Sequence, residues 1–245
     1  MAPRALDALD ELPGFRRRFR MTPGAGWVCS EVEDDYHHMT VTVHHDGVRA
    51  TSLEPVIHRA PWTTCPGAVL ELERTFTGVA LKDFVSRGEK QANCTHLHDL
   101  ALMAAAHAAD PGTLVFDILV SDPIAGAAGE KVRRAEVRCN GATLLSWVES
   151  GFRLIEPAEL AGVTFDKMRP WIDKLDPARQ EAARLLRWGN MIANGRIIPL
   201  EKQSDASRMP ANCYTFQPLR AAQAKRVGVI RDFSNGSAQP LERSS

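Results

Sequence analysis

The chain has 245 residues, 44% of them hydrophobic, with 30 basic and 30 acidic side chains. This length can bury a substantial core, and the balanced charge argues against a general binder of nucleic acids. No apolar run approaches the roughly 20 residues that a membrane helix needs, and the N-terminus, which contains acidic residues, does not match a signal peptide. Five scattered cysteines are typical of a reducing compartment. We therefore expect a cytoplasmic protein without nucleic-acid or membrane partners.

The sequence suggests three segments. Residues 1–25 contain a short basic run and end in the turn-prone stretch Thr-Pro-Gly-Ala-Gly, so we predict an N-terminal arm. Residues 26–200 are expected to form a single α+β domain whose chemistry lies in its first half. Residues 201–245 are expected to form a C-terminal extension that is flexible in part.

Apolar and polar side chains alternate after position 26, which predicts β-strands. In the stretch YHHMTVTVHH, His37 shares one face with a methionine and two valines, and His38 lies on the other face. Asp46-Gly47 is a typical two-residue hairpin turn, so we expect an antiparallel hairpin of residues 35–45 and 48–58. If the apolar face is buried, His37 points into the core.

The remaining elements alternate between helices and strands. Residues 113–122 predict a strand whose apolar edge would suit pairing between two subunits, so we also expect a homodimer. Asn140-Gly141 predicts a second hairpin turn. A long helix is expected to begin at Asp176-Pro177 and to end near a left-handed Gly195. Shorter helices are expected at residues 68–74, 79–87 and 95–109. Together these patterns predict an α+β fold, an antiparallel sheet built from hairpins and covered by helices.

All eight histidines lie between His37 and His107, so the first half of the chain carries the candidate chemistry. Histidine titrates near neutral pH and is the commonest metal ligand in proteins. Cys94 and His96 are expected at a helix N-terminus, where the helix dipole and free amides favour a thiolate. An inward histidine and a small buried thiol are also ordinary packing features, and the sequence leaves that alternative open.

Several well-known motifs are absent from the sequence. It has no paired Cys-x-x-Cys spacing of structural zinc modules, no Gly-x-Ser-x-Gly elbow, no phosphate-binding loop and no Gly-rich dinucleotide fingerprint. These absences argue against a zinc finger, nucleotide hydrolysis and a nucleotide cofactor.

Four motifs in chain order, YHHMTVTVHHDG, PWTTCP, CTHLHDL and NCYTF, resemble a bacterial family known as a domain of unknown function. In that family a His-Asp-Met strand motif precedes a Pro-aromatic-x-x-Cys segment and a Gly-Cys-Thr-His-Leu helix start. The resemblance covers roughly residues 25–235, most distinctively residues 36–100. It singles out His37, Met39, Cys65, Cys94, Thr95, His96 and Leu97. The chain departs from the pattern at His38, where the family has aspartate, and at Asn93, where it has glycine.

The resemblance implies that four of these polar residues converge in one pocket. They are expected to hold a metal ion, zinc or iron: His37, Cys65, Cys94 and His96. Because His38 replaces an acidic group beside the family histidine, the acid-base chemistry of this chain can differ from that of its relatives.

The expected function is a lyase that cleaves a C–C bond of a small aromatic or phenolic metabolite, by decarboxylation or by retro-aldol release of an aldehyde. It would work with a metal or without a cofactor. The candidate catalytic residues are His37, His38 and His96. The candidate substrate-binding residues are the aromatic side chains Trp27, Tyr36 and Trp62. The alternatives are a metal-dependent hydrolase and a non-catalytic protein that binds a metal, an iron–sulfur cluster or a small ligand.

Overall fold

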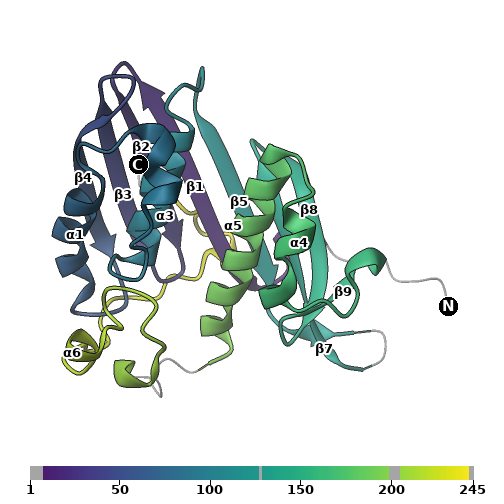
Figure 1. The fold of residues 1–245 in the computed structure, drawn as a ribbon. Coiled ribbons are helices and arrows are strands. Elements are labelled where there is room, and N and C mark those ends of the chain that lie inside the picture. The colour runs from purple at the N-terminus through teal and green to yellow at the C-terminus, as the bar shows by residue number, and fades with distance from the viewer. Residues whose placement is uncertain (1–7, 127–128, 199–204, 243–245) are drawn as a thin grey trace. The chain divides into compact units, whose positions relative to one another are not determined.

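The structure, a computed structural model, describes residues 8–126, 129–198 and 205–242 (Figure 1). Within these ranges it has the expected α+β fold, in which nine strands form an antiparallel sheet and six α-helices pack against it. No helix in the described ranges is long and apolar enough to cross a membrane. The first residues of the expected arm, Pro199, and both ends of the expected C-terminal extension lie outside the described residues.

The chain divides into two compact units. The first unit contains residues 18–115 and 200–231, and the second contains residues 1–17, 116–199 and 232–244. These boundaries differ from the three segments expected from the sequence. One reason is that described residues of the C-terminal part pack with the first half of the chain.

The first four strands follow one another in chain order and lie in the first unit, except for the first four residues of β1. They lie in the order β4-β3-β2-β1. Their bounds are β1 (Gly14–Gly24), β2 (Trp27–Asp34), β3 (His38–His45) and β4 (Ala50–Arg59). The antiparallel pair β3–β4 confirms the expected hairpin. In its turn the Asp46 carboxylate accepts the amide N–H groups of Val48 and Arg49, each at 2.8 Å.

Strand β1 occupies most of the stretch that was expected to be an arm, so that expectation was wrong for residues 14–24. Its side chains Phe15, Arg17, Phe19 and Met21 are all buried and follow the period of two that a strand requires. The basic run hid this pattern, because Arg17 occupies an inward position that charged side chains rarely take.

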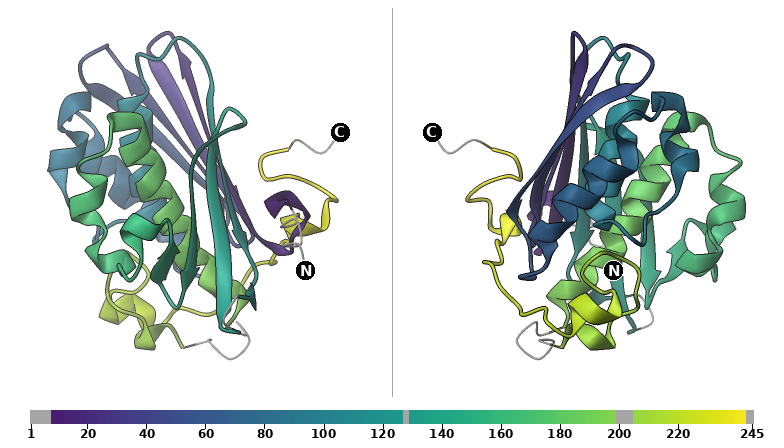
Figure 2. Two further views of the ribbon diagram at one scale, coloured as in Figure 1. Left: turned by 90° about the vertical axis from the view of Figure 1, so that its right-hand side faces the viewer. Right: turned by 60° about the vertical axis from the view of Figure 1, so that its left-hand side comes forward.

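Helices cover one face of strands β2–β4 in the first unit. Helix α3 packs on β2 and β3, and helix α1 packs on β4 (Figures 1 and 2). The helices of this unit are α1 (Ala68–Phe76), α2 (Phe84–Arg87), α3 (Thr95–Ala106) and α6 (Pro218–Ala221). The helix expected at residues 79–87 is shorter, since a 3-10 turn at Leu81–Asp83 precedes α2.

The second unit holds the remaining strands and helices. They are β5 (Leu114–Ser121), β6 (Ile124–Ala125), β7 (Lys131–Cys139), β8 (Ala142–Ser150), β9 (Arg153–Glu156), α4 (Arg169–Ile172) and α5 (Pro177–Ala193). The β7–β8 pair confirms the hairpin expected at Asn140-Gly141. Strand β9 was missed, because the chain reverses at Gly151-Phe152, where both residues have positive φ.

Two further expectations for this unit can be compared with the structure. Helix α5 begins as expected, with the Asp176 carboxylate accepting the amide N–H of Arg179 at 3.0 Å. Its end differs: Gly195 lies in a 3-10 turn, Asn194–Arg196, and not in a left-handed cap. Strand β5 has neighbours on both sides, β1 and β7, so it does not offer the free edge on which a homodimer was expected.

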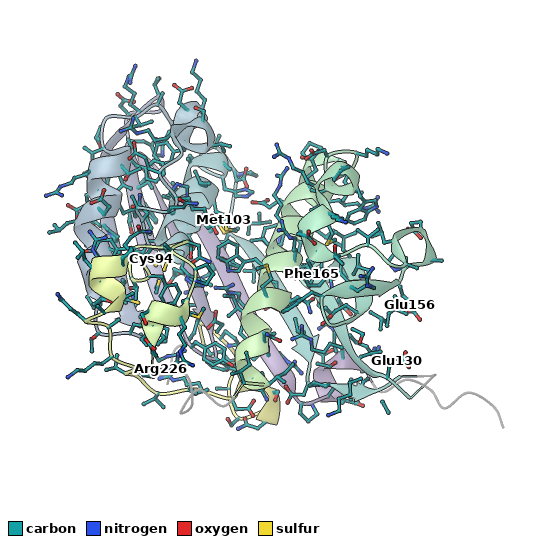
Figure 3. All side chains as sticks on the ribbon, turned by 60° about the horizontal axis from the view of Figure 1, so that its bottom comes forward. Cys94, Met103, Glu130, Glu156, Phe165 and Arg226 are labelled. Atoms are coloured by element: carbon teal, nitrogen blue, oxygen red, sulfur yellow. The ribbon has the colours of Figure 1, made fainter. Side chains whose placement is uncertain are left out.

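The core of the second unit contains a buried polar network. Trp147 donates its indole N–H to Asn190 at 2.8 Å, and Asn190 donates to Glu149 at 3.3 Å. Glu149 also accepts a hydrogen bond from buried Arg133. The ring of Phe165, labelled in Figure 3, lies 5.7 Å from the ring of Trp147. These hydrogen bonds link β7, β8 and α5.

Candidate functional site

A tight turn between β2 and β3 positions the first candidate residues. The Asp34 amide donates to the carbonyl of His37 at 2.9 Å. One carboxylate oxygen of Asp34, Oδ1, accepts the amide N–H groups of Tyr36 at 2.7 Å and of His37 at 2.8 Å. An aspartate that bonds to backbone amides two and three residues ahead is a common turn-forming device. The position of Asp34 in the sequence therefore determines the turn conformation that presents His37.

The same carboxylate contacts the imidazole of His37. Nδ1 of His37 lies 3.0 Å from Oδ1 and 3.3 Å from Oδ2 of Asp34. The Asp34 side chain is fully buried, and that of His37 is 9% exposed. An ionised carboxylate only accepts hydrogen bonds, so the shared proton belongs to Nδ1. Nε2 of a neutral His37 then carries the lone pair, as in a histidine held for general-base catalysis.

His96 completes the group from the second position of helix α3. Its ring stacks on that of His37, with centroids 3.9 Å apart and planes inclined by 29°. Asp34 and His37 are buried, whereas His96 is partly exposed. His96 is thus the most exposed member of the group, although its Nε2 atom is buried.

Asp34, His37 and His96 could hold a metal ion. Among the described residues this is the one group of three possible ligands whose donor atoms all lie within 4.8 Å of one another. Two histidines and one carboxylate match the donor set of several catalytic metal centres. A coordinated metal lies in the plane of each imidazole that binds it, and two stacked rings do not aim their lone pairs at one point. Coordination would require one ring to turn.

Arg59, at the end of β4, holds the turn from outside. Its guanidinium donates to the carbonyls of Asp34 at 2.6 Å, Asp35 at 2.7 Å and His37 at 3.2 Å. It also donates to the carboxylate of Glu33 at 3.1 Å, whose side chain is only 4% exposed. The backbone that carries Asp34 and His37 is thus held by a cation whose side chain is only 11% exposed. Sequence reasoning did not find this residue.

Three cysteines gather near one another in the first unit. Cys94, labelled in Figure 3, precedes α3, and its thiol contacts the amides of His96 and Leu97 and interacts electrostatically with Cys65 and Cys213. Burial raises the pKa of the Cys94 thiol to about 12, and burial also raises the pKa of Cys65. The thiolate expected from the helix dipole is therefore not favoured, because desolvation outweighs the amide contacts.

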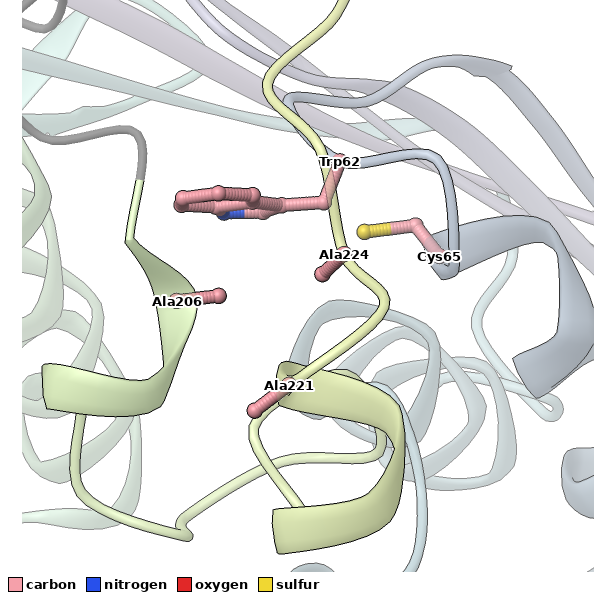
Figure 4. Packing of buried hydrophobic residues seen from close by; sticks show 5 residues of the cluster. All are labelled: Trp62, Cys65, Ala206, Ala221 and Ala224. Atoms are coloured by element: carbon pink, nitrogen blue, oxygen red, sulfur yellow. The ribbon is translucent and has the colours of Figure 1, made fainter.

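Cys65 and Trp62 belong to a packed cluster in the first unit. Both are buried, and their neighbours in the cluster are Ala206, Ala221 and Ala224 (Figure 4). The Cys65 thiol also forms a hydrogen bond with the Thr215 hydroxyl at 3.4 Å. Trp62, expected to bind substrate, is 6% exposed and fills this cluster.

The structure brings together only part of the expected metal set. His37 and His96 meet, but Cys65 and Cys94 do not belong to the group within 4.8 Å, where Asp34 provides the third donor. One signal in the sequence pointed to Asp34: three consecutive acidic residues end just before Tyr36 and His37. An Asp three positions before a histidine can reach it only across a turn, and no turn was expected there.

The other expected site residues lie outside this group. His38 is the first residue of β3, and its side chain points away from that of the preceding His37. Its ring is 4.4 Å from that of His58, and burial lowers its pKa. Tyr36 is next to His37 in the turn, with ring centroids 6.2 Å apart. Trp27 begins β2, seven residues before Asp34, and seven strand residues span about 23 Å.

Comparison with protein-family models finds no match, and no curated protein matches the chain. The resemblance based on the four sequence motifs therefore stays a prediction. The chemistry of the group must be argued from its geometry.

Proposed function

We propose that the chain is an enzyme that acts on a small organic molecule, with Asp34, His37 and His96 as its acid-base centre. The buried Asp34–His37 hydrogen bond beside a stacked, partly exposed His96 supports this proposal most directly. A histidine that only satisfies a buried carboxylate needs no second imidazole stacked on it. Two adjacent imidazoles, one of them oriented by a carboxylate, are suited to general acid–base catalysis at neutral pH.

The reaction class we propose is C–C bond cleavage by a lyase, on a substrate that is an aromatic or phenolic metabolite. His37 accepts the proton of a substrate hydroxyl at Nε2, and the C–O bond becomes a carbonyl as the adjacent C–C bond breaks. The electron pair of that bond moves to the other carbon, next to an electron-withdrawing group of the substrate. A proton from His96 completes the product at that carbon, and an aldehyde leaves.

The stacking suits this division of roles. Repulsion disfavours a positive charge on both rings at 3.9 Å, so the proposal gives the two rings different roles. One ring then accepts a proton while the other donates one. In this proposal Asp34 is added to the expected catalytic residues, because it orients His37. His38 is no longer one of them, because its side chain points away from that of His37.

A screen for aldehyde release tests the proposal. The wild-type chain, His37→Gln and Asp34→Asn would be incubated with a panel of phenolic compounds that carry a hydroxyl group β to an electron-withdrawing group. The released aldehyde would be trapped and quantified. We expect release by the wild type and loss of at least 100-fold in His37→Gln. His107→Gln is the matched control, since His107 forms a comparable histidine–aspartate pair, 2.7 Å from Asp110, at the other end of α3. Equal rates in all variants would disprove the proposal.

A metal-dependent hydrolase is the second candidate, favoured by the three donor atoms within 4.8 Å. Bound zinc or iron would polarise a substrate oxygen or activate water. Elemental analysis of protein purified without a His tag or chelator tests this candidate. About one metal per chain, lost in His96→Ala and kept in Cys94→Ser, would support the hydrolase over the metal-free lyase. A non-catalytic metal or iron–sulfur carrier has less support, because Cys65 and Cys94 are buried and protonated.

A further inference from the structure

A second candidate site lies on the other face of the β3–β4 hairpin. An open groove of about 570 Å³ is lined there by His38, His58, Arg59, Val227, Val229 and Arg231. His38 points to this face because neighbouring strand residues alternate, and His37 and Met39 point toward α3. This volume falls within the range of about 300–1,000 Å³ that is usual for small-molecule sites.

The groove carries an excess of positive charge. Arg59 and Arg231 both form ion pairs with the same carboxylate, Glu33, at 3.1 and 3.2 Å. The lining contains two arginines and no acidic residue, and the carboxylate that pairs with both arginines, Glu33, is only 4% exposed. Such a site repels a metal cation and attracts an anion.

The side chains in the groove differ in how many of their hydrogen-bond donors already bond to other groups of the protein. Arg59 is fixed by its bonds to three backbone carbonyls and to Glu33, so it acts as a positioned charge. The Arg231 side chain is 59% exposed and bonds Glu33 through one nitrogen, which leaves its other donors to meet a ligand. The rings of His38 and His58 lie 4.4 Å apart. His58 Nε2 bonds to the Thr40 hydroxyl at 3.2 Å, so the nitrogen that His58 can offer a ligand is Nδ1.

The lining favours a carboxylate attached to an apolar body. A guanidinium binds a planar carboxylate through two parallel hydrogen bonds. Val227 and Val229 supply apolar surface, and two imidazole rings supply faces on which an aromatic ring can rest. We propose that this groove binds a small organic carboxylate, at a site separate from the Asp34–His37–His96 centre. This assignment goes beyond the proposed lyase activity and does not depend on it.

Calorimetric titration with benzoate tests the inference. We expect saturable binding to the wild-type chain, weakened at least 10-fold in Arg231→Ala and in His58→Ala. His44→Ala is the matched control, because His44 shares the strand face of His38 but pairs with Glu54, at 3.1 Å, outside the groove. His96→Ala should bind benzoate as the wild type does, which separates this site from the acid-base centre.

Several results would overturn the inference. They are no saturable benzoate binding, equal affinity in Arg231→Ala and the wild type, or loss of binding in His96→Ala. Titrations with inorganic phosphate and with zinc complete the comparison. Binding of phosphate without benzoate, or of zinc lost in His58→Ala, would replace the carboxylate assignment. Circular dichroism of each variant checks folding, which the exposed position of Arg231 should preserve.

Discussion

Asp34 collects three hydrogen bonds on one oxygen, two from backbone amides and one from the His37 ring. Asp34→Asn keeps the shape of the side chain but removes its charge and one acceptor, so His37 loses the partner that fixes its tautomer. We expect kcat/KM on the substrate found by screening to fall about 10²- to 10⁴-fold, mainly through kcat. Asp110→Asn, which changes the equivalent partner of His107, should leave kcat and kcat/KM unchanged.

Arg59 is expected to be a stability determinant of the turn. Arg59→Ala leaves buried Glu33 without one cation and removes donors from the carbonyls of Asp34 and Asp35. We expect the free energy of unfolding to fall by about 3 kcal/mol, the range for breaking a buried ion pair. Urea denaturation measures the loss. Arg231→Ala removes a much more exposed partner of the same carboxylate and should change stability by less than about 1 kcal/mol; equal losses would contradict the assignment.

Cys94 should make stability depend on alkaline pH. Its pKa is about 12 in the folded chain against a usual value of 9.0, because burial disfavours the thiolate. The unfolded chain therefore releases this proton first as the pH rises. The contribution of the buried Cys94 thiol to the free energy of unfolding is constant below about pH 9. It is lost toward pH 12, at about 1.4 kcal/mol per pH unit. Denaturation of Cys94→Ala at several pH values should show a shallower decline. An identical slope would contradict the burial of the ionisable thiol. Cys139→Ala is the comparison and should change the slope less, because Cys139 is partly exposed and burial raises its pKa by a smaller amount.

Part of the candidate centre could be predicted from the sequence. The alternation around His37 placed it inward with Met39, and the helix start placed His96 within the first turn of α3. Asp34 and Arg59 could not be found in this way. Their roles depend on a turn and on a neighbouring strand, and a single sequence shows neither the turn geometry nor which strand end faces it.

Strand β1 offers a test at the scale of one element. A Cβ atom on Gly14 would lie 2.1 Å from the carbonyl oxygen of Val120, so the strand cannot accept a side chain there without moving the backbone. We expect Gly14→Ala to lower the free energy of unfolding by about 3 kcal/mol. Gly112→Ala is the control, because nothing lies within 4 Å of its added Cβ and its φ is not positive. Thermal or urea denaturation showing equal stability for both variants would contradict the packing of β1.

Elements marked by local chemistry were predictable. Asp46-Gly47 and Asn140-Gly141 marked both expected hairpins, and Asp176-Pro177 marked the start of α5. Strand β1 was not predictable in the same way, since burial of Arg17 is decided by tertiary packing that overrides the preference of its side chain. Strand β9 followed a reversal at positive φ on Phe152, a residue type that gives no turn signal.

At the scale of the whole molecule, distant segments meet in the first unit. The amide of Arg231 donates to the carbonyl of Asp35 at 2.9 Å, and that of Tyr214 to Asn93 at 2.8 Å. These contacts bring Cys213 and the groove residues to the first half of the chain, although the sequence suggested only an appended extension. Contacts across almost 200 residues leave no local pattern in a sequence, which explains why the groove was not expected.

The central claim is that Asp34 holds His37 with its proton on Nδ1, leaving Nε2 to accept a proton. The ¹⁵N resonances of the His37 ring, assigned by comparison with His37→Gln, test this most directly and need no substrate. In the neutral ring the account predicts a protonated Nδ1 and an unprotonated Nε2, with that preference lost in Asp34→Asn. A proton on Nε2, with Nδ1 bare or bound to a metal ion, would contradict it.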